Sequence, residues 1–221
     1  MREFIIGINE AGQRLDKYLK KILPNASSGF LYKMLRKKNI TCNKAKMTGK
    51  EQLKKGDRIQ IFFSEETFMK FMQDPEKLKN EFEQLKTLPL KGLRVVYEDE
   101  DILIADKPYN MLSQKAKDHD ISANEYLLGY LIRSGSLELE GFASFRPSVC
   151  NRLDRNTTGL LLMGKSLNGS QTLSQALKDR TIRKFYRALV SGEIKESAHL
   201  SGYLRKDEKT NQVEILEKEA D

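Results

Sequence analysis

Apolar residues recur at helical spacing twice near the start of the chain. After residue 13 they follow one another at intervals of three and four, which predicts a helix over about 14–23 that stops before Pro24. The same spacing follows Ser27 and Ser28, either of which is a suitable N-cap, and predicts a second helix. The inward positions are Leu15, Tyr18, Leu19 and Ile22 in the first helix and Phe30, Leu31, Met34 and Leu35 in the second.

Short strand-like segments surround these two helices. Residues 4–8, 40–43 and 58–63 are expected to be strands, and the Gly56-Asp57 turn introduces the last of them. Residues 1–63 are therefore predicted to form a small domain of helices and strands.

Residues 64–91 are polar and form an expected linker. Asp74 and Pro75 are typical of a helix start, and Pro89 sets the end of that helix. The segment is either an interdomain connector or a helix packed against the following domain. Its apolar positions are Leu78, Phe82 and Leu85.

Residues 92–221 mix strand and helix signals without regular strand–helix–strand alternation, which predicts the α+β class. The expected elements are a β-hairpin from about Leu93 to Lys107, a helix over about 122–131 opened by a Ser122–Glu125 capping box, loop and hairpin over 135–147, a buried strand over 160–163, a helix over about 170–179 and a strand over 182–190.

Composition and charge narrow the classes of protein. The 221 residues are 39% hydrophobic and 32% charged, which is typical of a globular chain rather than a disordered one. The chain contains no apolar run of about 20 residues, so no membrane span is predicted. The start of the chain is unlike a signal peptide, and we therefore expect a cytoplasmic protein. The net charge of +8 favours an anionic partner such as nucleic acid or an acidic membrane surface.

The metal-ligating residue types are scarce. The chain has two cysteines, Cys42 and Cys150, and two histidines, His119 and His199, none of them at a metal-ligand spacing. We expect no metal site.

The first 63 residues resemble an S4 RNA-binding domain. The resemblance rests on Arg14-Leu-Asp-Lys-Tyr-Leu, the second helix, the strand after it and Lys55-Gly56-Asp57, and it covers about residues 12–63. Without it, the basic cluster after the second helix is equally well explained as a solvated face. The resemblance implies that Arg14, Lys33, Arg36, Lys37, Lys38, Lys44 and Lys46 face RNA phosphates.

One acidic residue stands between two arginines just before the apolar run 160–163. In Arg152-Leu-Asp154-Arg155 the guanidinium groups favour the ionised carboxylate, as a carboxylate nucleophile requires. By itself this arrangement is more typical of an ordinary ion pair.

The surrounding sequence resembles the RluA family of pseudouridine synthases. Asn151-Arg-Leu-Asp-Arg-Asn-Thr-Thr-Gly159 is similar to the catalytic signature of that family, which often has His at the first position. A second family motif, Lys-x-Tyr-x-Ala-x-Val-x-Gly, matches Lys184 to Gly192. The resemblance implies a synthase domain with a mixed, largely antiparallel sheet behind the S4-like domain.

The family implies a reaction and roles for three residues. The reaction isomerises uridine to pseudouridine in RNA, with ribosomal RNA expected because members with an S4 domain commonly act there, and it needs no cofactor. By resemblance, Asp154 is the nucleophile, Arg152 binds substrate and Tyr186 stacks on the uracil. Asp154 would attack either the ribose C1′ or the uracil C6. The resemblance also implies a monomer.

The chain departs from the family pattern in three places. Asn151 replaces the frequent His, Tyr109-Asn110 replaces a small residue and Gly, and the third motif, an Arg-x-His-Gln-Ile-Arg-like segment, is missing. We expect the chain to be a fragment whose residues 199–215 start the next family hairpin. The alternative is a noncatalytic RNA-binding protein with an incomplete synthase domain. A glycosidase-like hydrolase is disfavoured because no pair of acidic groups is evident.

Overall fold

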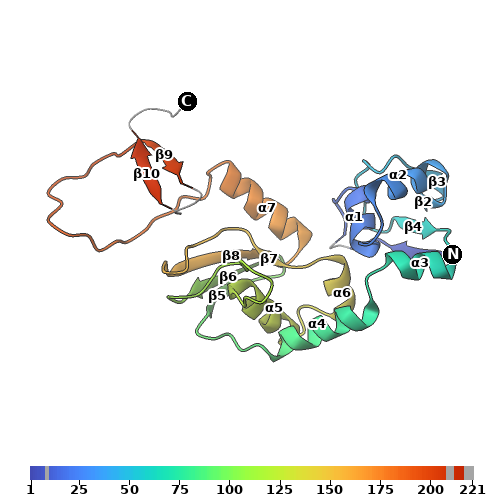
Figure 1. Cartoon of the computed structure of the whole chain (residues 1–221), viewed down its shortest axis with the longest axis horizontal. Helices are drawn as coiled ribbons and strands as arrows, with labels where there is room; N and C mark the ends of the chain where they lie inside the picture. Colours follow the sequence, from blue (N-terminus) through green and yellow to red (C-terminus); the bar gives the residue numbers. More distant parts are fainter. Residues whose placement is uncertain (8–9, 208–211, 217–221) are drawn as a thin grey trace. The chain divides into compact units, whose positions relative to one another are not determined.

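A computed structural model describes residues 1–7, 10–207 and 212–216 (Figure 1). The chain divides into two compact units, residues 1–183 and 184–221. Among the described residues, no helix is long and apolar enough to cross a membrane.

The first unit begins with an antiparallel four-stranded sheet in the order β1-β4-β2-β3. Apolar side chains from these strands and from the first two helices enclose one core, which includes Leu15, Leu19, Leu35, Ile40 and Ile59. The elements are β1 (Arg2–Ile5), α1 (Leu15–Ile22), α2 (Ser28–Arg36), β2 (Ile40–Cys42), β3 (Ala45–Lys46) and β4 (Arg58–Ile61).

The start of α2 confirms the cap expected from the sequence. The Ser27 hydroxyl accepts a hydrogen bond from the backbone N–H of Phe30, at 3.2 Å, and so satisfies a free donor of the first turn. The α1 helix begins one residue after its expected start and ends one residue before its expected end.

A tight turn before β4 holds a strongly acidic carboxyl group. Burial raises the pKa of Glu51, but hydrogen bonds from the Thr48 hydroxyl and from the backbone N–H groups of Thr48 and Gly49 outweigh that effect and lower the pKa to about 2. Because the folded pKa lies below the ordinary value of 4.5, the ionised carboxylate stabilises the fold above that pH, and the stabilisation is lost as the pH falls toward 2.

We expect E51Q to lower the free energy of unfolding at pH 7 by about 1–2 kcal/mol, since part of the shift is screened by solvent. Urea unfolding of both proteins should show this difference shrinking as the pH falls from 4.5 toward 2. The control is E83Q, at an exposed position of the helix over residues 75–87, which should leave the unfolding midpoint nearly unchanged. A difference between E51Q and wild type that stays constant with pH would contradict this assignment.

The polar segment 64–91 contains two helices, α3 (Glu65–Phe71) and α4 (Pro75–Thr87), of which only the second was predicted. Asp74 caps α4 as expected, accepting a hydrogen bond from the N–H of Glu76. Phe82 and Leu85 of α4 are buried in one hydrophobic core with residues that follow in the sequence, such as Leu127. Helix α4 is therefore packed against the following residues rather than being part of a free connector.

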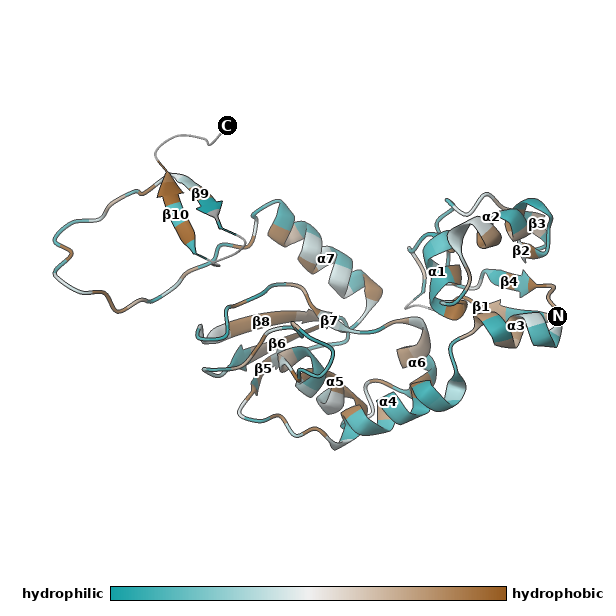
Figure 2. Ribbon diagram, in the orientation of Figure 1, coloured by the Kyte–Doolittle hydropathy of each residue, from teal (hydrophilic) through white to brown (hydrophobic). Residues whose placement is uncertain are grey.

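Helix α4 lies against α5 (Ala123–Arg133). A Cβ atom at Gly129 would lie 2.3 Å from the backbone oxygen of Leu85, so only glycine allows this approach of the two helices. Figure 2 shows hydrophilic residues along much of α4 and hydrophobic residues along β8 (Gly159–Gly164).

The second sheet of this unit has the order β5-β6-β8-β7, and all its neighbouring strands are antiparallel. Its inward residues pack against α5 in a core that includes Leu103, Ala105, Leu127, Leu161 and Met163. Helices and antiparallel sheets are thus mixed, as the α+β prediction required. The remaining elements are β5 (Arg94–Glu98), β6 (Ile102–Lys107), α6 (Leu139–Ser144), β7 (Ser148–Val149) and α7 (Leu167–Lys178).

Two sequence predictions in this part of the chain are wrong. Where loop and hairpin were expected over 135–147, the structure has the short helix α6. Two glycines in this segment favour a loop, but the fully buried Phe142 ring packs edge-to-face on Phe82, with ring centroids 5.7 Å apart, and this packing overrides the local preference.

The strand expected over 182–190 is also absent. An isolated strand is unstable without a paired neighbour, and no strand among the described residues pairs with this segment. Within the second unit, β9 (Tyr203–Lys206) and β10 (Val213–Leu216) pair with each other in an antiparallel hairpin. A hairpin is thus present in the region where residues 199–215 were expected to start one, with strands at 203–206 and 213–216.

Candidate active site

The loop of residues 150–158 joins β7 to β8 and carries Arg152 and Asp154. Both of these side chains are exposed, whereas Leu153 between them is half-buried and packs against the hydrophobic core. The alternation anchors the loop through its apolar residue and presents the two charged residues to solvent.

Asn151 ties the start of this loop to β8. Its side-chain Nδ2 donates to the backbone oxygen of Leu160 at 3.0 Å, and its Oδ1 accepts from the N–H of Leu162 at 2.7 Å. The N–H of Cys150 donates to the oxygen of Leu162 at 2.7 Å. The Asn151 amide therefore pairs with β8 as a strand backbone would, which gives the departure from the frequent family histidine a structural role.

Lys107, at the end of β6, holds the other end of the loop. Its side chain is fully buried, and its Nζ donates to the backbone oxygens of Met111 at 2.8 Å and of Pro108 and Arg155 at 3.2 Å. Burial lowers the pKa of Lys107, and the nearby Asp154 carboxylate opposes this effect. A buried positive charge thus lies beneath the loop.

Lys107 was not among the predicted site residues, although the sequence contains a signal for it. Inward positions of β6 alternate along Leu103, Ala105 and Lys107, so the lysine occupies a core position of the strand. A charged residue at such a position requires buried polar partners.

The two arginines next to Asp154 in the sequence, Arg152 and Arg155, do not pair with its carboxylate in the described part of the chain. The Asp154 carboxylate instead lies close enough to the buried Lys107 ammonium to oppose the lowering of the Lys107 pKa.

We expect K107M to lower the free energy of unfolding by about 2–4 kcal/mol, because three backbone oxygens lose their donor. Denaturant unfolding monitored by circular dichroism measures the loss. K79M, which changes an exposed lysine of α4 in the same way, is the control and should cost little. An unfolding midpoint of K107M equal to that of K79M would contradict this assignment.

The three candidate site residues belong to two different units of the chain. Arg152 and Asp154 share one loop, whereas Tyr186 belongs to the second unit, in irregular chain, and its side chain is 64% exposed.

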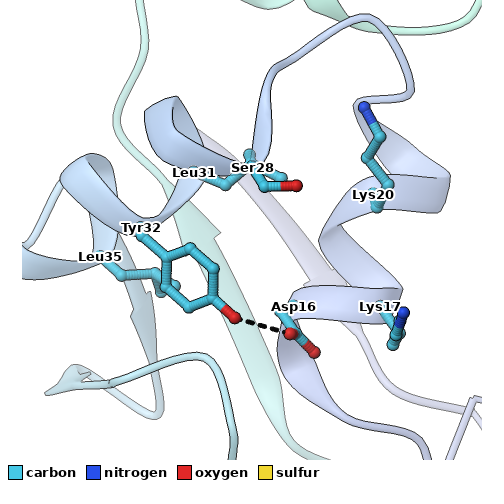
Figure 3. Close-up of a pocket in the computed structure, with 7 residues that line it drawn as sticks. All are labelled: Asp16, Lys17, Lys20, Ser28, Leu31, Tyr32 and Leu35. Carbon is cyan, nitrogen blue, oxygen red and sulfur yellow. Dashed lines mark hydrogen bonds between the residues drawn. The ribbon is translucent and has the colours of Figure 1, made fainter.

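The basic residues predicted to face RNA all have exposed side chains. They are Arg14, Lys33, Arg36, Lys37, Lys38, Lys44 and Lys46. Arg14 is also paired with Asp16, to which its Nε and Nη2 donate at 3.1 and 2.6 Å. Figure 3 shows the Tyr32 hydroxyl pointing at the same carboxylate, with a hydrogen bond of 2.8 Å. Asp16 therefore joins α1 to α2 and orients Arg14.

Comparison with known families decides the class of protein. The family model for RNA pseudouridylate synthase matches residues 101–220, more than half of the chain, including the loop that carries Asp154. The chain belongs to the RNA pseudouridylate synthase family. This confirms the family expected from the sequence.

Individual relatives agree with this family. A Mycoplasma genitalium protein described as an uncharacterized RNA pseudouridine synthase is 27% identical over 96% of this chain and 63% of its own length. The ribosomal large subunit pseudouridine synthase C of Rickettsia felis is 31% identical over 86% of this chain and 58% of its own length. The chain thus spans about three fifths of the length of these synthases.

Among solved structures, human RNA pseudouridylate synthase domain containing 4 is 17% identical, with a TM-score of 0.32 over 47% of this chain and 35% of that one.

Proposed function

We propose that the protein is an RNA pseudouridine synthase that uses Asp154 as its nucleophile. The observation that carries the proposal is the loop 150–158, which lies within the family match and presents an exposed carboxylate on a backbone held from both ends. A fixed and accessible carboxylate suits nucleophilic catalysis on a base lifted out of its stack.

The reaction breaks the N1–C1′ glycosidic bond of uridine, rotates the uracil and joins its C5 to the same C1′, with loss of the C5 proton. Arg152, beside Asp154 on the exposed side of the loop, would bind the RNA or the target nucleotide. Tyr186 would stack on the uracil, and its exposed ring is free to do so in the second unit.

Ribosomal RNA is the proposed substrate, because the Rickettsia felis relative is named as a synthase of the large ribosomal subunit. Residues 1–63 would act as an S4-type RNA-binding domain whose exposed lysines and arginines contact phosphates. The two packed helices, the antiparallel sheet and the positive charge of the chain support this role.

Nucleoside analysis tests the proposal. Unmodified ribosomal RNA is incubated with the protein, digested to nucleosides and separated, and free uracil is measured in the same sample. We expect pseudouridine to appear in the amount by which uridine falls, without free uracil. Free uracil would identify a hydrolase, and unchanged nucleosides with bound RNA would favour a noncatalytic RNA-binding protein.

A further inference from the structure

One buried hydroxyl holds the middle of the candidate loop. The Oγ of Ser113 donates to the backbone oxygen of Leu153 at 2.6 Å and accepts from the N–H of the same residue at 2.9 Å. Ser113 is only 4% exposed. Within the described ranges, neither backbone group of Leu153 has another hydrogen-bond partner.

Ser113 is itself fixed to the start of α5. Its backbone oxygen accepts from the N–H of Asn124 and from the Ser122 hydroxyl, both at 3.3 Å. The preceding residue, Leu112, accepts from the N–H of Ala123 at 2.7 Å. The hydroxyl therefore extends from a loop segment that is hydrogen-bonded to the start of α5.

The neighbouring side chains join the same two segments. The Asn124 side chain accepts from the N–H of Val149 at 3.0 Å, and the Gln114 side chain donates to the oxygen of Val149 at 3.3 Å. Segment 112–114 thus lies between the α5 N-terminus and residues 149–153. Of these contacts, only those of Ser113 reach the residue that precedes Asp154.

We propose that Ser113 is a positioning residue that fixes the backbone carrying Asp154 through this two-way hydrogen bond to Leu153. The inference rests on the proposed function, since it assigns Ser113 a part in the same reaction. Leu153 and Asp154 share a peptide bond, so a shift of Leu153 moves the carboxylate directly. A displacement of about 1 Å at a reacting group can cost about 100-fold in rate.

The test compares four serine variants by rate and by hydrogen exchange. S113A removes the hydroxyl, and S113T and S113V form a pair of similar shape in which a methyl group of valine stands in place of the threonine hydroxyl. S166A is the matched control. The Ser166 hydroxyl, which lies near the far end of β8, also accepts a hydrogen bond from a backbone N–H, that of Gly169. It also donates a hydrogen bond, to the Asp101 carboxylate. Single-turnover tritium release from [5-³H]uridine-labelled ribosomal RNA, RNA affinity and exchange of the Leu153 amide are measured on the same preparations.

We expect S113A and S113V to release tritium about 10–100-fold more slowly than wild type with nearly unchanged RNA affinity. S113T should stay near the wild-type rate, and the Leu153 amide should exchange faster only where the hydroxyl is lost. S166A should lose stability without losing rate.

Equal rates of S113T and S113V, or a loss in S166A as large as in S113A, would overturn the positioning role. If the wild type releases no tritium, the proposed function fails separately, and exchange at Leu153 then decides whether Ser113 fixes the loop. Unchanged exchange in S113A overturns the inference in that case, and faster exchange supports it.

Discussion

Replacing Asp154 with asparagine is expected to reduce tritium release from [5-³H]uridine-labelled RNA below detection. The asparagine amide has nearly the shape of the carboxylate but cannot attack carbon as an anion, so the covalent step is lost. The side chain is exposed and makes no ion pair in the described part of the chain, so the fold should be retained even though the buried Lys107 loses a nearby negative charge. RNA affinity should also stay nearly unchanged.

The control for D154N is E83Q, which removes one negative charge at an exposed position of α4. It should release tritium at the wild-type rate. Turnover by D154N comparable to that of E83Q would remove Asp154 as the nucleophile. Because the two variants carry the same net charge, a difference between them is not an effect of total charge on RNA binding.

Removing the positive charges at the end of α2 is expected to produce the largest change in RNA affinity. The triple variant R36A/K37A/K38A deletes three exposed cations next to one another. Each phosphate contact that is lost lowers the slope of log affinity against log salt by about 0.7–0.9, so the slope should fall by up to about 2–3. Filter binding or fluorescence anisotropy at several salt concentrations measures the slope.

The matched control is K77A/K79A/K86A, which deletes three exposed lysines of α4. Alanine suits the helical positions Arg36, Lys77, Lys79 and Lys86, whereas Lys37 and Lys38 follow the end of α2. A change in slope that is equal in the two triple variants would show that only net charge matters, and an unchanged slope in R36A/K37A/K38A would place the RNA-binding surface elsewhere.

Elements with a strong local pattern were predictable from the sequence. Helix α2 follows from its apolar spacing and the Ser27 cap, and α5 from the Ser122–Glu125 capping box, both of which are present. Helix α6 was not predictable, because burial of Phe142 against Phe82 decides it and the two residues are far apart in the chain. The strand expected over 182–190 failed because alternation alone provides no pairing partner.

In the candidate site, too, residues of a local motif were predictable and residues that act through distant contacts were not. Arg152 and Asp154 were found because they belong to one short motif whose residues are neighbours in sequence. Lys107 and Ser113 were not assigned to the site, because their contacts with the loop span 48 and 40 residues of chain. Local sequence identifies the residues that we propose to react, whereas the side chains that hold them depend on how β6 and α5 pack beside the loop.

Tritium release from [5-³H]uridine-labelled, unmodified ribosomal RNA by the unaltered 221-residue chain is the most direct measurement. Formation of the C5–C1′ bond displaces the tritium into water, which neither RNA binding nor glycosidic hydrolysis alone would do. We expect tritium release that continues over many turnovers. RNA that binds the protein but retains all its tritium would contradict it.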